Sequence, residues 1–169
     1  MRTQVKIIVG SGLFLALAVV LPVIFHQFQL YGRIFLPMHL PVLMAGLLLG
    51  PVSGFIVGIL APGISFLLTG MPPPYAVPMM SIELPLYGLT AGLIANKFKL
   101  PTFAALIIAI IVGRIGFVAG FYLAGFFLAL PYEPAYWLYA STITAVPGII
   151  LQLILIPLIL PILKRVFPA

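Results

Sequence analysis

The stretch PMHLPVLMAGLLLGPVSGFIVG, residues 37–58, indicates what kind of fold this sequence encodes. Apart from His39 and Ser53 it consists of apolar residues, glycine and proline, and it contains no formally charged side chain. Such a stretch does not suit a water-soluble domain, in which about a quarter of the residues are charged. Its Gly50-Pro51 pair predicts a tight turn between two apolar helices, because proline is tolerated in the first turn of a helix but not in its interior.

The rest of the chain has the same character. Of its 169 residues 64% are hydrophobic, and only eight are Lys or Arg and two are Asp or Glu. The mean hydropathy is +1.33. This composition indicates an integral membrane protein, and we expect one membrane domain over residues 1–169 without a soluble domain. The absence of cysteine excludes disulfides and thiolate metal sites.

Breaks at proline, glycine and charged residues divide the chain into apolar spans. Six are predicted, at about residues 5–25, 38–50, 51–70, 78–96, 101–128 and 137–163. The expected fold class is therefore an all-α integral membrane bundle of six transmembrane helices. Most spans approach the ~20 residues that cross a bilayer, whereas the second has about fourteen residues and a length of about 20 Å as a helix.

Basic residues predict the orientation. Six of them form three clusters at span ends, namely Arg2 with Lys6, Lys97 with Lys99, and Lys164 with Arg165. Because cytoplasmic ends carry the excess of Lys and Arg, six crossings would place all three clusters and both termini in the cytoplasm. We expect a multi-pass protein of a bacterial-type cell membrane. Its outer connections would be residues 26–37, 71–77 and 129–136.

Two ionisable residues lie inside predicted spans. Glu83 lies fourteen residues before Lys97, and Arg114 lies fifteen residues after Lys99. Both would sit about 20–22 Å above the turn that joins their helices, so an ion pair between them is geometrically available. In one interpretation such a pair has a purely structural role, which is to fix the register of the two helices. Alternatively, one or both groups could face an outward-open cavity, since ionisable groups within membranes mark substrate paths.

Further candidates lie toward the outer side. His39 begins the short second span, where it could be a structural hydrogen-bond donor, facing outer-loop residues, or a ligand contact. Arg33 is the one basic residue of an outer connection, and it could meet an anionic ligand group. Glu133 could have a functional role, but its place among aromatic residues is equally consistent with an aromatic belt at the outer interface. The full set of expected substrate contacts is Arg33, His39, Tyr75, Glu83, Tyr87, Arg114, Tyr132 and Trp137.

Small residues recur four apart in several spans, a spacing that lets helices approach closely in lipid. The pairs include Gly54 with Gly58 and Gly88 with Gly92. Most such pairs should be internal packing. The pair Gly12 and Ala16 in the first span could instead face a partner subunit.

Enzymatic function is not expected. The sequence holds two histidines and two carboxylates, with none at metal-ligand spacing, and it has no phosphate-binding loop of the Walker type. We therefore expect no catalytic residue, no metal site and no cofactor.

The sequence resembles the substrate-binding S component of energy-coupling-factor (ECF) vitamin transporters. The residues that carry the resemblance are 37–51, Gly54, Gly58, 69–73 and 83–88. The resemblance covers about residues 1–165. It implies a compact six-helix protein that binds a vitamin from outside, using the outer loops and the outer halves of helices four to six. Transport in the family is understood as toppling of the loaded S component within the membrane.

The resemblance also implies partners, namely a membrane coupling subunit and two ATPase subunits. A small-x-x-x-small motif on the first helix contacts the coupling subunit in that family, and Gly12 with Ala16 occupies the matching place. The usual form of the motif has two alanines, so Gly12 is a departure from it.

The polar candidates suit a small molecule with an anionic group, and the Pro-Met-His stretch looks most like pantothenate- and pyridoxine-type members. Pantothenate is the expected substrate, with pyridoxine and cobalamin as alternatives. A self-sufficient channel or facilitator, or a membrane scaffold that binds no ligand, remains the alternative function.

Overall fold

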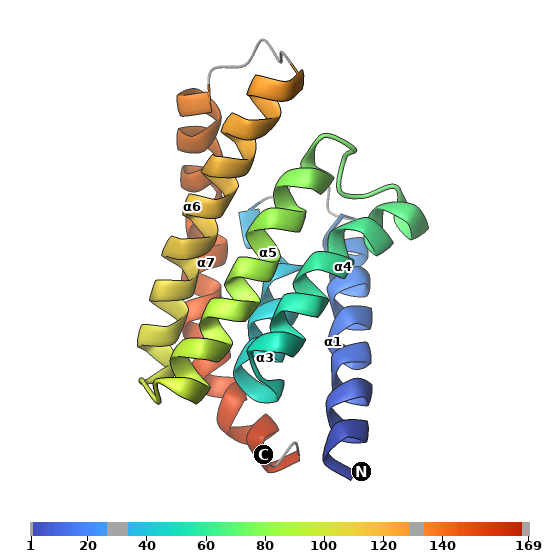
Figure 1. Cartoon of the computed structure of the whole chain (residues 1–169), viewed down its shortest axis with the longest axis vertical. Helices are drawn as coiled ribbons and strands as arrows, with labels where there is room; N and C mark the ends of the chain where they lie inside the picture. The colour runs from blue at the N-terminus through green and yellow to red at the C-terminus, as the bar shows by residue number, and fades with distance from the viewer. Residues whose placement is uncertain (1, 27–33, 129–133, 167–169) are drawn as a thin grey trace.

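A computed structural model describes residues 2–26, 34–128 and 134–166, and within these ranges all regular structure is helical. The elements are α1 (Arg2–His26), α3 (His39–Leu49), α4 (Pro51–Thr69), α5 (Ala76–Gly92), the π-helix η1 (Leu93–Lys97) that continues α5, α6 (Thr102–Leu128) and α7 (Pro134–Val166) (Figure 1). The expected all-helical fold is confirmed.

Five helical segments in the described ranges are long and apolar enough to cross a membrane. They are Gln4–Phe25, Pro51–Thr69, Ala76–Lys97, Thr102–Tyr122 and Thr142–Arg165. The remaining predicted span corresponds to α3, which has 11 residues and is therefore about 17 Å long. It is shorter than a helix that crosses the hydrocarbon core by itself.

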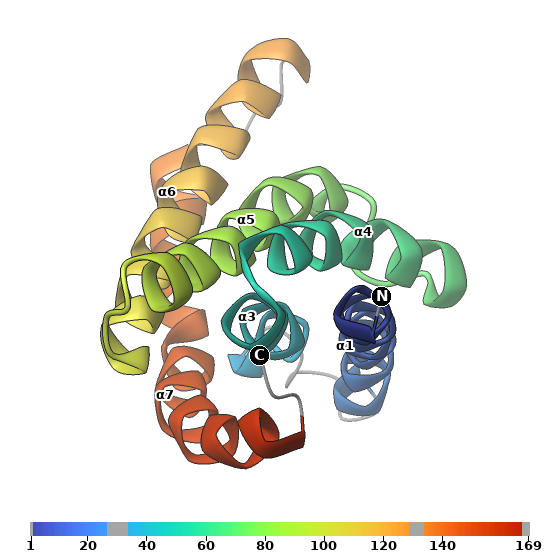
Figure 2. The same cartoon turned by 60° about the horizontal axis from the view of Figure 1, so that its bottom comes forward.

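The short helix α3 lies at the centre of the bundle. It contacts α1, α4, α5 and α7, and the view along the bundle shows it between α1 and α7 with α4 and α5 on a third side (Figure 2). Its residues from Pro41 to Leu47 are all buried. An apolar surface on every side is what a helix needs when it is surrounded by other helices, so α3 accounts for the uniformly apolar stretch in the sequence.

Glycines bring the backbones of α3, α4 and α5 into direct contact. A Cβ atom built on Gly54 would lie 2.7 Å from the Cα of Gly46 and 2.7 Å from the carbonyl carbon of Gly88. One built on Gly58 would lie 2.6 Å from the carbonyl carbon of Leu84. Real Cβ atoms essentially never come so close to backbone. The glycine pairs of α4 and α5 are thus internal packing, as predicted.

The predicted turn between α3 and α4 is also confirmed. Gly50 has a φ of 104°, a conformation that favours glycine, and Pro51 begins α4 directly after it. The Gly50 amide donates to the Gly46 carbonyl at 3.1 Å. The Asn96 side-chain amide of η1 donates to the same carbonyl at 3.2 Å. The turn is therefore tied to the far end of α5.

Both termini and the turn between α5 and α6 lie at the same end of the molecule (Figure 1). This end carries the exposed basic side chains Lys6, Lys97, Lys99, Lys164 and Arg165. The grouping of the three basic clusters at one end agrees with the sequence analysis.

We predict that Gly88→Ala lowers the free energy of unfolding by at least about 1–3 kcal/mol, the usual cost of overpacking a filled interior, because its methyl group would meet the Gly54 backbone. Gly63→Ala is the matched control, since a Cβ there meets nothing within 4 Å and alanine is the better helix former. Denaturant unfolding in detergent measures both. Equal stability of the two variants would contradict the backbone contact between α4 and α5.

Candidate functional site

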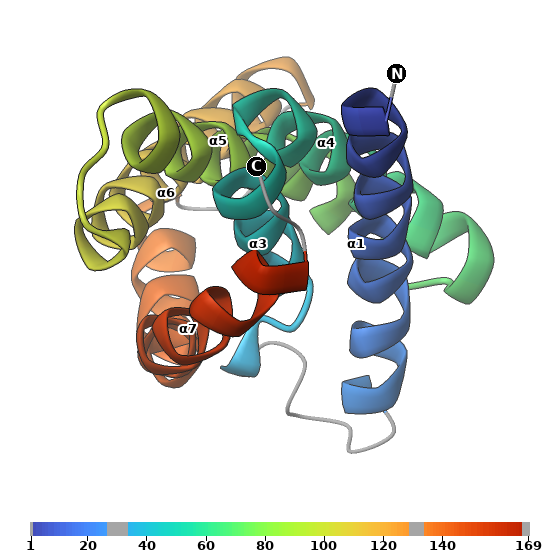
Figure 3. The same ribbon diagram turned by 90° about the horizontal axis from the view of Figure 1, so that it is seen from below.

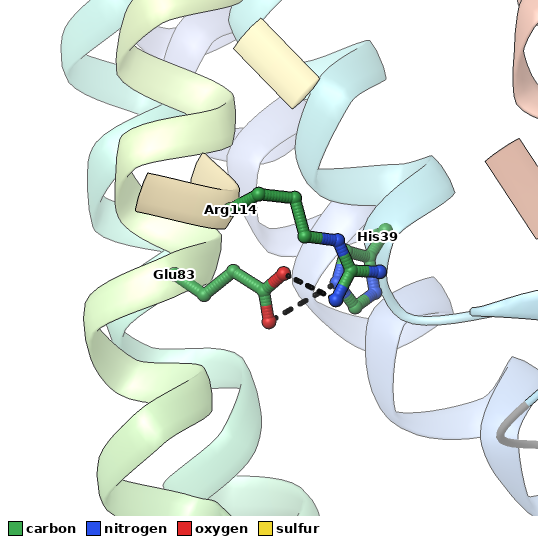
Figure 4. Close-up of polar contacts among 3 residues, drawn as sticks. All are labelled: His39, Glu83 and Arg114. Carbon is green, nitrogen blue, oxygen red and sulfur yellow. Dashed lines mark ion pairs between the residues drawn. The ribbon is translucent and has the colours of Figure 1, made fainter. Parts of the chain in front are cut away.

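A buried carboxylate lies at the junction of three helices. Glu83 of α5 is 3% exposed. Its Oε2 atom lies 3.7 Å from Nε2 of His39 at the start of α3, and its Oε1 atom lies 3.4 Å from Nη1 of Arg114 on α6. Figure 4 shows the carboxylate reaching from α5 toward both partners. The contact between Glu83 and Arg114 that the sequence spacing allowed is present, and His39 is an additional member of the cluster.

The packing of α3 against α5 positions His39. Gly46 and His39 are seven residues apart, which is two helical turns, and therefore share one face of α3. Gly46 on this face meets the backbone of Gly88, and His39 meets Glu83. His39 thus faces α5, and the expectation that it faces outer-loop residues was wrong. It is 2% exposed.

Small residues on α6 position Arg114 in the same way. A Cβ atom on Gly113 would collide with the ring of Tyr87, and one on Gly116 would collide with the side chain of Leu86. Without these side chains α6 packs close to α5, and Arg114 reaches Glu83 from the neighbouring position. The side chain of Arg114 is 13% exposed.

Tyr87 forms the wall of the cluster. It lies one turn after Glu83 on α5 and is fully buried. Its ring stands edge-on to the ring of His39, with centroids 5.1 Å apart and an interplanar angle of 86°. Tyr87 also interacts electrostatically with Glu83 and with Arg114.

The cluster has more hydrogen-bonding capacity than it uses. The distances of 3.4 and 3.7 Å are longer than the 2.7–3.2 Å of ordinary hydrogen bonds. Among the described residues, six polar atoms of the cluster make no hydrogen bond. They are the two ring nitrogens of His39, Oε1 of Glu83, the hydroxyl oxygen of Tyr87, and Nε and Nη2 of Arg114. Buried polar groups are almost always hydrogen-bonded, so this arrangement suits an added polar molecule.

Gln152 was missed by the sequence analysis. It is 1% exposed, and neither its Oε1 nor its Nε2 atom has a partner among the described residues. It belongs to the buried stripe of α7 formed by Ala145, Gly148, Gln152, Ile156 and Leu160. One turn earlier, Gly148 lies against the backbone of Ile34 and Phe35, so Gln152 is near the level of the chain that leads into α3. A search for ionisable residues overlooks such an amide, although it interrupts the apolar run from Ala145 to Ile156.

The structure thus brings together four of the eight predicted contacts, namely His39, Glu83, Tyr87 and Arg114. Tyr75 precedes α5 and is 57% exposed, two turns from Glu83. Arg33 and Tyr132 lie outside the described residues, as does Glu133. Trp137 lies near the start of α7, and its side chain is not described.

The predicted partner-facing pair lies on the outside of the bundle. Gly12 and Ala16 of α1 are exposed, and a Cβ on Gly12 would meet nothing within 4 Å. The buried face of α1 is instead formed by Gly10, Phe14, Ala18 and Pro22. The small-residue pair therefore takes no part in packing among the described helices.

The chemistry of the cluster suits a polar molecule rather than a metal ion. Among the described residues no group of three or more His, Cys, Asp or Glu could hold a metal ion. An apolar groove lies elsewhere, between α1, α3 and α7.

A family model described as "ECF transporter, substrate-specific component" matches residues 6–160. No curated protein and no solved structure matches the chain.

We predict that Gln152→Leu raises the free energy of unfolding in the absence of ligand by about 1–2 kcal/mol, because leucine removes two buried polar atoms that lack partners. Gln152→Asn keeps the amide and is the control, for which no gain is expected. Thermal unfolding in detergent measures both. A loss of stability in Gln152→Leu would mean that the amide is hydrogen-bonded after all.

Proposed function

The chain belongs to the family of ECF transporter substrate-specific components, and from this premise we propose that it captures a small anionic B vitamin, such as pantothenate, from outside the cell. Membership supports a role as a substrate-binding subunit of a membrane transporter, and a transport subunit of this kind fits a protein that is not an enzyme. The observation that carries the proposal about the substrate is the cluster of His39, Glu83, Tyr87 and Arg114, buried but short of hydrogen bonds.

Arg114 is the proposed anchor for the anionic group. Its Nη1 atom is directed to Glu83, whereas Nε and Nη2 have no hydrogen-bond partner among the described residues. Guanidinium groups bind carboxylates through two parallel hydrogen bonds, and Nε with Nη2 is one of the two pairs of nitrogens that can do so. A ligand carboxylate could therefore bind Arg114 while Glu83 stays in place.

His39 lies on the other side of the Glu83 carboxylate. Its Nε2 atom is 3.7 Å from Oε2 of Glu83. We propose that His39 remains the neighbour of this carboxylate when Arg114 holds the ligand.

The neutral part of the ligand needs hydrogen-bond donors and acceptors. Tyr87 and Gln152 supply a buried hydroxyl and a buried amide that make no hydrogen bond of ordinary geometry among the described residues. Pantothenate has a carboxylate, an amide and two hydroxyl groups and suits this set, whereas pyridoxine has no carboxylate. We propose that Arg33, Tyr75, Tyr132 and Trp137 complete the outer side of the site.

The distribution of charges supports an orientation in the membrane. The exposed basic residues gather at the end that holds both termini, and such ends face the cytoplasm. We propose six crossings with both termini inside, in which the short α3 contributes the second crossing from within the bundle. The beginning of α3 with His39 would then lie toward the outside.

The proposed partners are a membrane coupling subunit and two ATPase subunits. The exposed pair Gly12 and Ala16 allows another helix to approach α1 closely. This face points away from α3, so the contact would leave the ligand site undisturbed.

Calorimetry with a panel of B vitamins on the purified chain tests the proposal. We expect one carboxylate-bearing vitamin to bind with nanomolar affinity. No heat with any member of the panel would contradict a vitamin-binding role.

For the vitamin that binds, Glu83→Gln and Arg114→Met should each weaken the affinity at least tenfold, or about 1.4 kcal/mol, since each removes a charge from the site. Lys97→Gln is the control, because Lys97 is exposed at the opposite end of α5. Unchanged affinity in both site variants would reduce the ion pair to a structural role.

Gly12→Leu should abolish co-purification with the coupling subunit while vitamin affinity stays the same, because a large side chain would fill the outward face of α1. Gly63→Leu is the matched control, since Gly63 is another helical glycine with open space around it. If Gly12→Leu instead impairs vitamin binding, the pair belongs to the interior.

A further inference from the structure

An apolar groove runs between α1 and α7 over the surface of α3. It has a volume of about 180 Å³, and its lining presents no polar surface. Phe14, Leu17 and Leu21 line it from α1, Met44 from α3, and Ile159 and Leu163 from α7. The view from the end that carries the termini shows α1 and α7 on either side of α3 (Figure 3).

The lining residues of the groove extend along both helices. Those on α1 span seven positions, or about 10 Å of helix, and those on α7 from Leu155 to Leu163 span about 12 Å. An apolar cavity of about 150 Å³ accepts a benzene molecule, so this groove can take a short stretch of hydrocarbon. A helix, with a diameter of about 10–12 Å, could lie over the groove but not within it.

One end of the groove is basic. Leu163 lines the groove and is followed at once by Lys164 and Arg165, both exposed in the last turn of α7. On α1 the exposed Lys6 lies eight residues, or about 12 Å, before Phe14. Basic sites between transmembrane helices bind the head groups of anionic lipids.

From the apolar lining and the charges at its end we infer that this groove is a binding site for a phospholipid with an anionic head group. Part of one acyl chain lies between α1 and α7 over Met44, and the phosphate is held by Lys164 and Arg165. This site is separate from the polar cluster, because Leu40, Pro41 and Met44 line the groove whereas His39 faces α5. It is also separate from the outward face of α1 that carries Gly12 and Ala16.

The test compares phosphatidylglycerol with phosphatidylcholine of identical acyl chains, each added to the purified full-length chain in detergent, with bound lipid counted by native mass spectrometry. Leu17→Trp fills the groove, and Ile8→Trp is its control, because position 8 lies on the opposite face of α1 and Ile8 is 70% exposed. Lys164→Gln with Arg165→Gln removes the charges. Lys97→Gln with Lys99→Gln is the control for a basic cluster that does not adjoin the groove.

We expect the wild-type chain to retain phosphatidylglycerol at least tenfold better than phosphatidylcholine. Leu17→Trp and the Lys164/Arg165 variant should each lower this retention about tenfold, and both controls should stay within twofold. If Leu17→Trp fails to fold, Ile159→Phe fills the groove from α7 instead.

Equal retention of the two lipids, retention of neither, or equal losses in the controls would overturn the inference. So would a Leu17→Trp variant that keeps phosphatidylglycerol but no longer assembles with the coupling subunit, because the groove would then be a subunit contact. No vitamin takes part in the measurement, so its outcome is independent of the proposed substrate.

Discussion

The carboxylate of Glu83 is the feature on which the account depends. An ionised side chain in the middle of a membrane helix costs about 2.5–3.5 kcal/mol on insertion scales, and here the group is 3% exposed. Its neighbours His39 and Arg114 reduce this cost, but a buried ion pair is often no more stable than apolar residues of the same volume. Stability alone therefore does not explain the cluster, particularly since its distances leave several polar atoms without hydrogen bonds. The proposed binding of a polar molecule would explain it.

The glycine contacts make this site possible. Because α3, α4 and α5 touch through their backbones at Gly46, Gly54 and Gly88, a helix of only 11 residues is held firmly at the centre. His39 at its first turn is thereby presented to Glu83. The polar cluster thus lies next to closely packed backbones, which suits a binding site because rigid elements hold side chains in place without further loss of entropy.

The positions of the helices and part of the polar cluster could be predicted from the sequence. Long apolar runs delimited by charges predicted the positions of the helices, and the similar distances of Glu83 and Arg114 from their shared turn indicated that the two could meet. Which faces of α1 and α3 are buried could not be predicted, because a helix that is apolar on all sides carries no pattern that marks its buried face. Only packing reveals that Gly10 and Phe14 point inward and Gly12 points outward. The same holds for His39 and Gln152, whose neighbours come from distant parts of the chain.

Infrared difference spectroscopy on vitamin binding tests the central claim most directly. The chain has only two acidic side chains, so its carboxylate bands can be assigned by a single substitution. Saturation with the bound vitamin, isotopically labelled to separate its own carboxylate, should shift a carboxylate band that disappears in Glu83→Gln. A Glu83 band that is identical with and without the vitamin would show that the ligand binds elsewhere, and the cluster would then be structural.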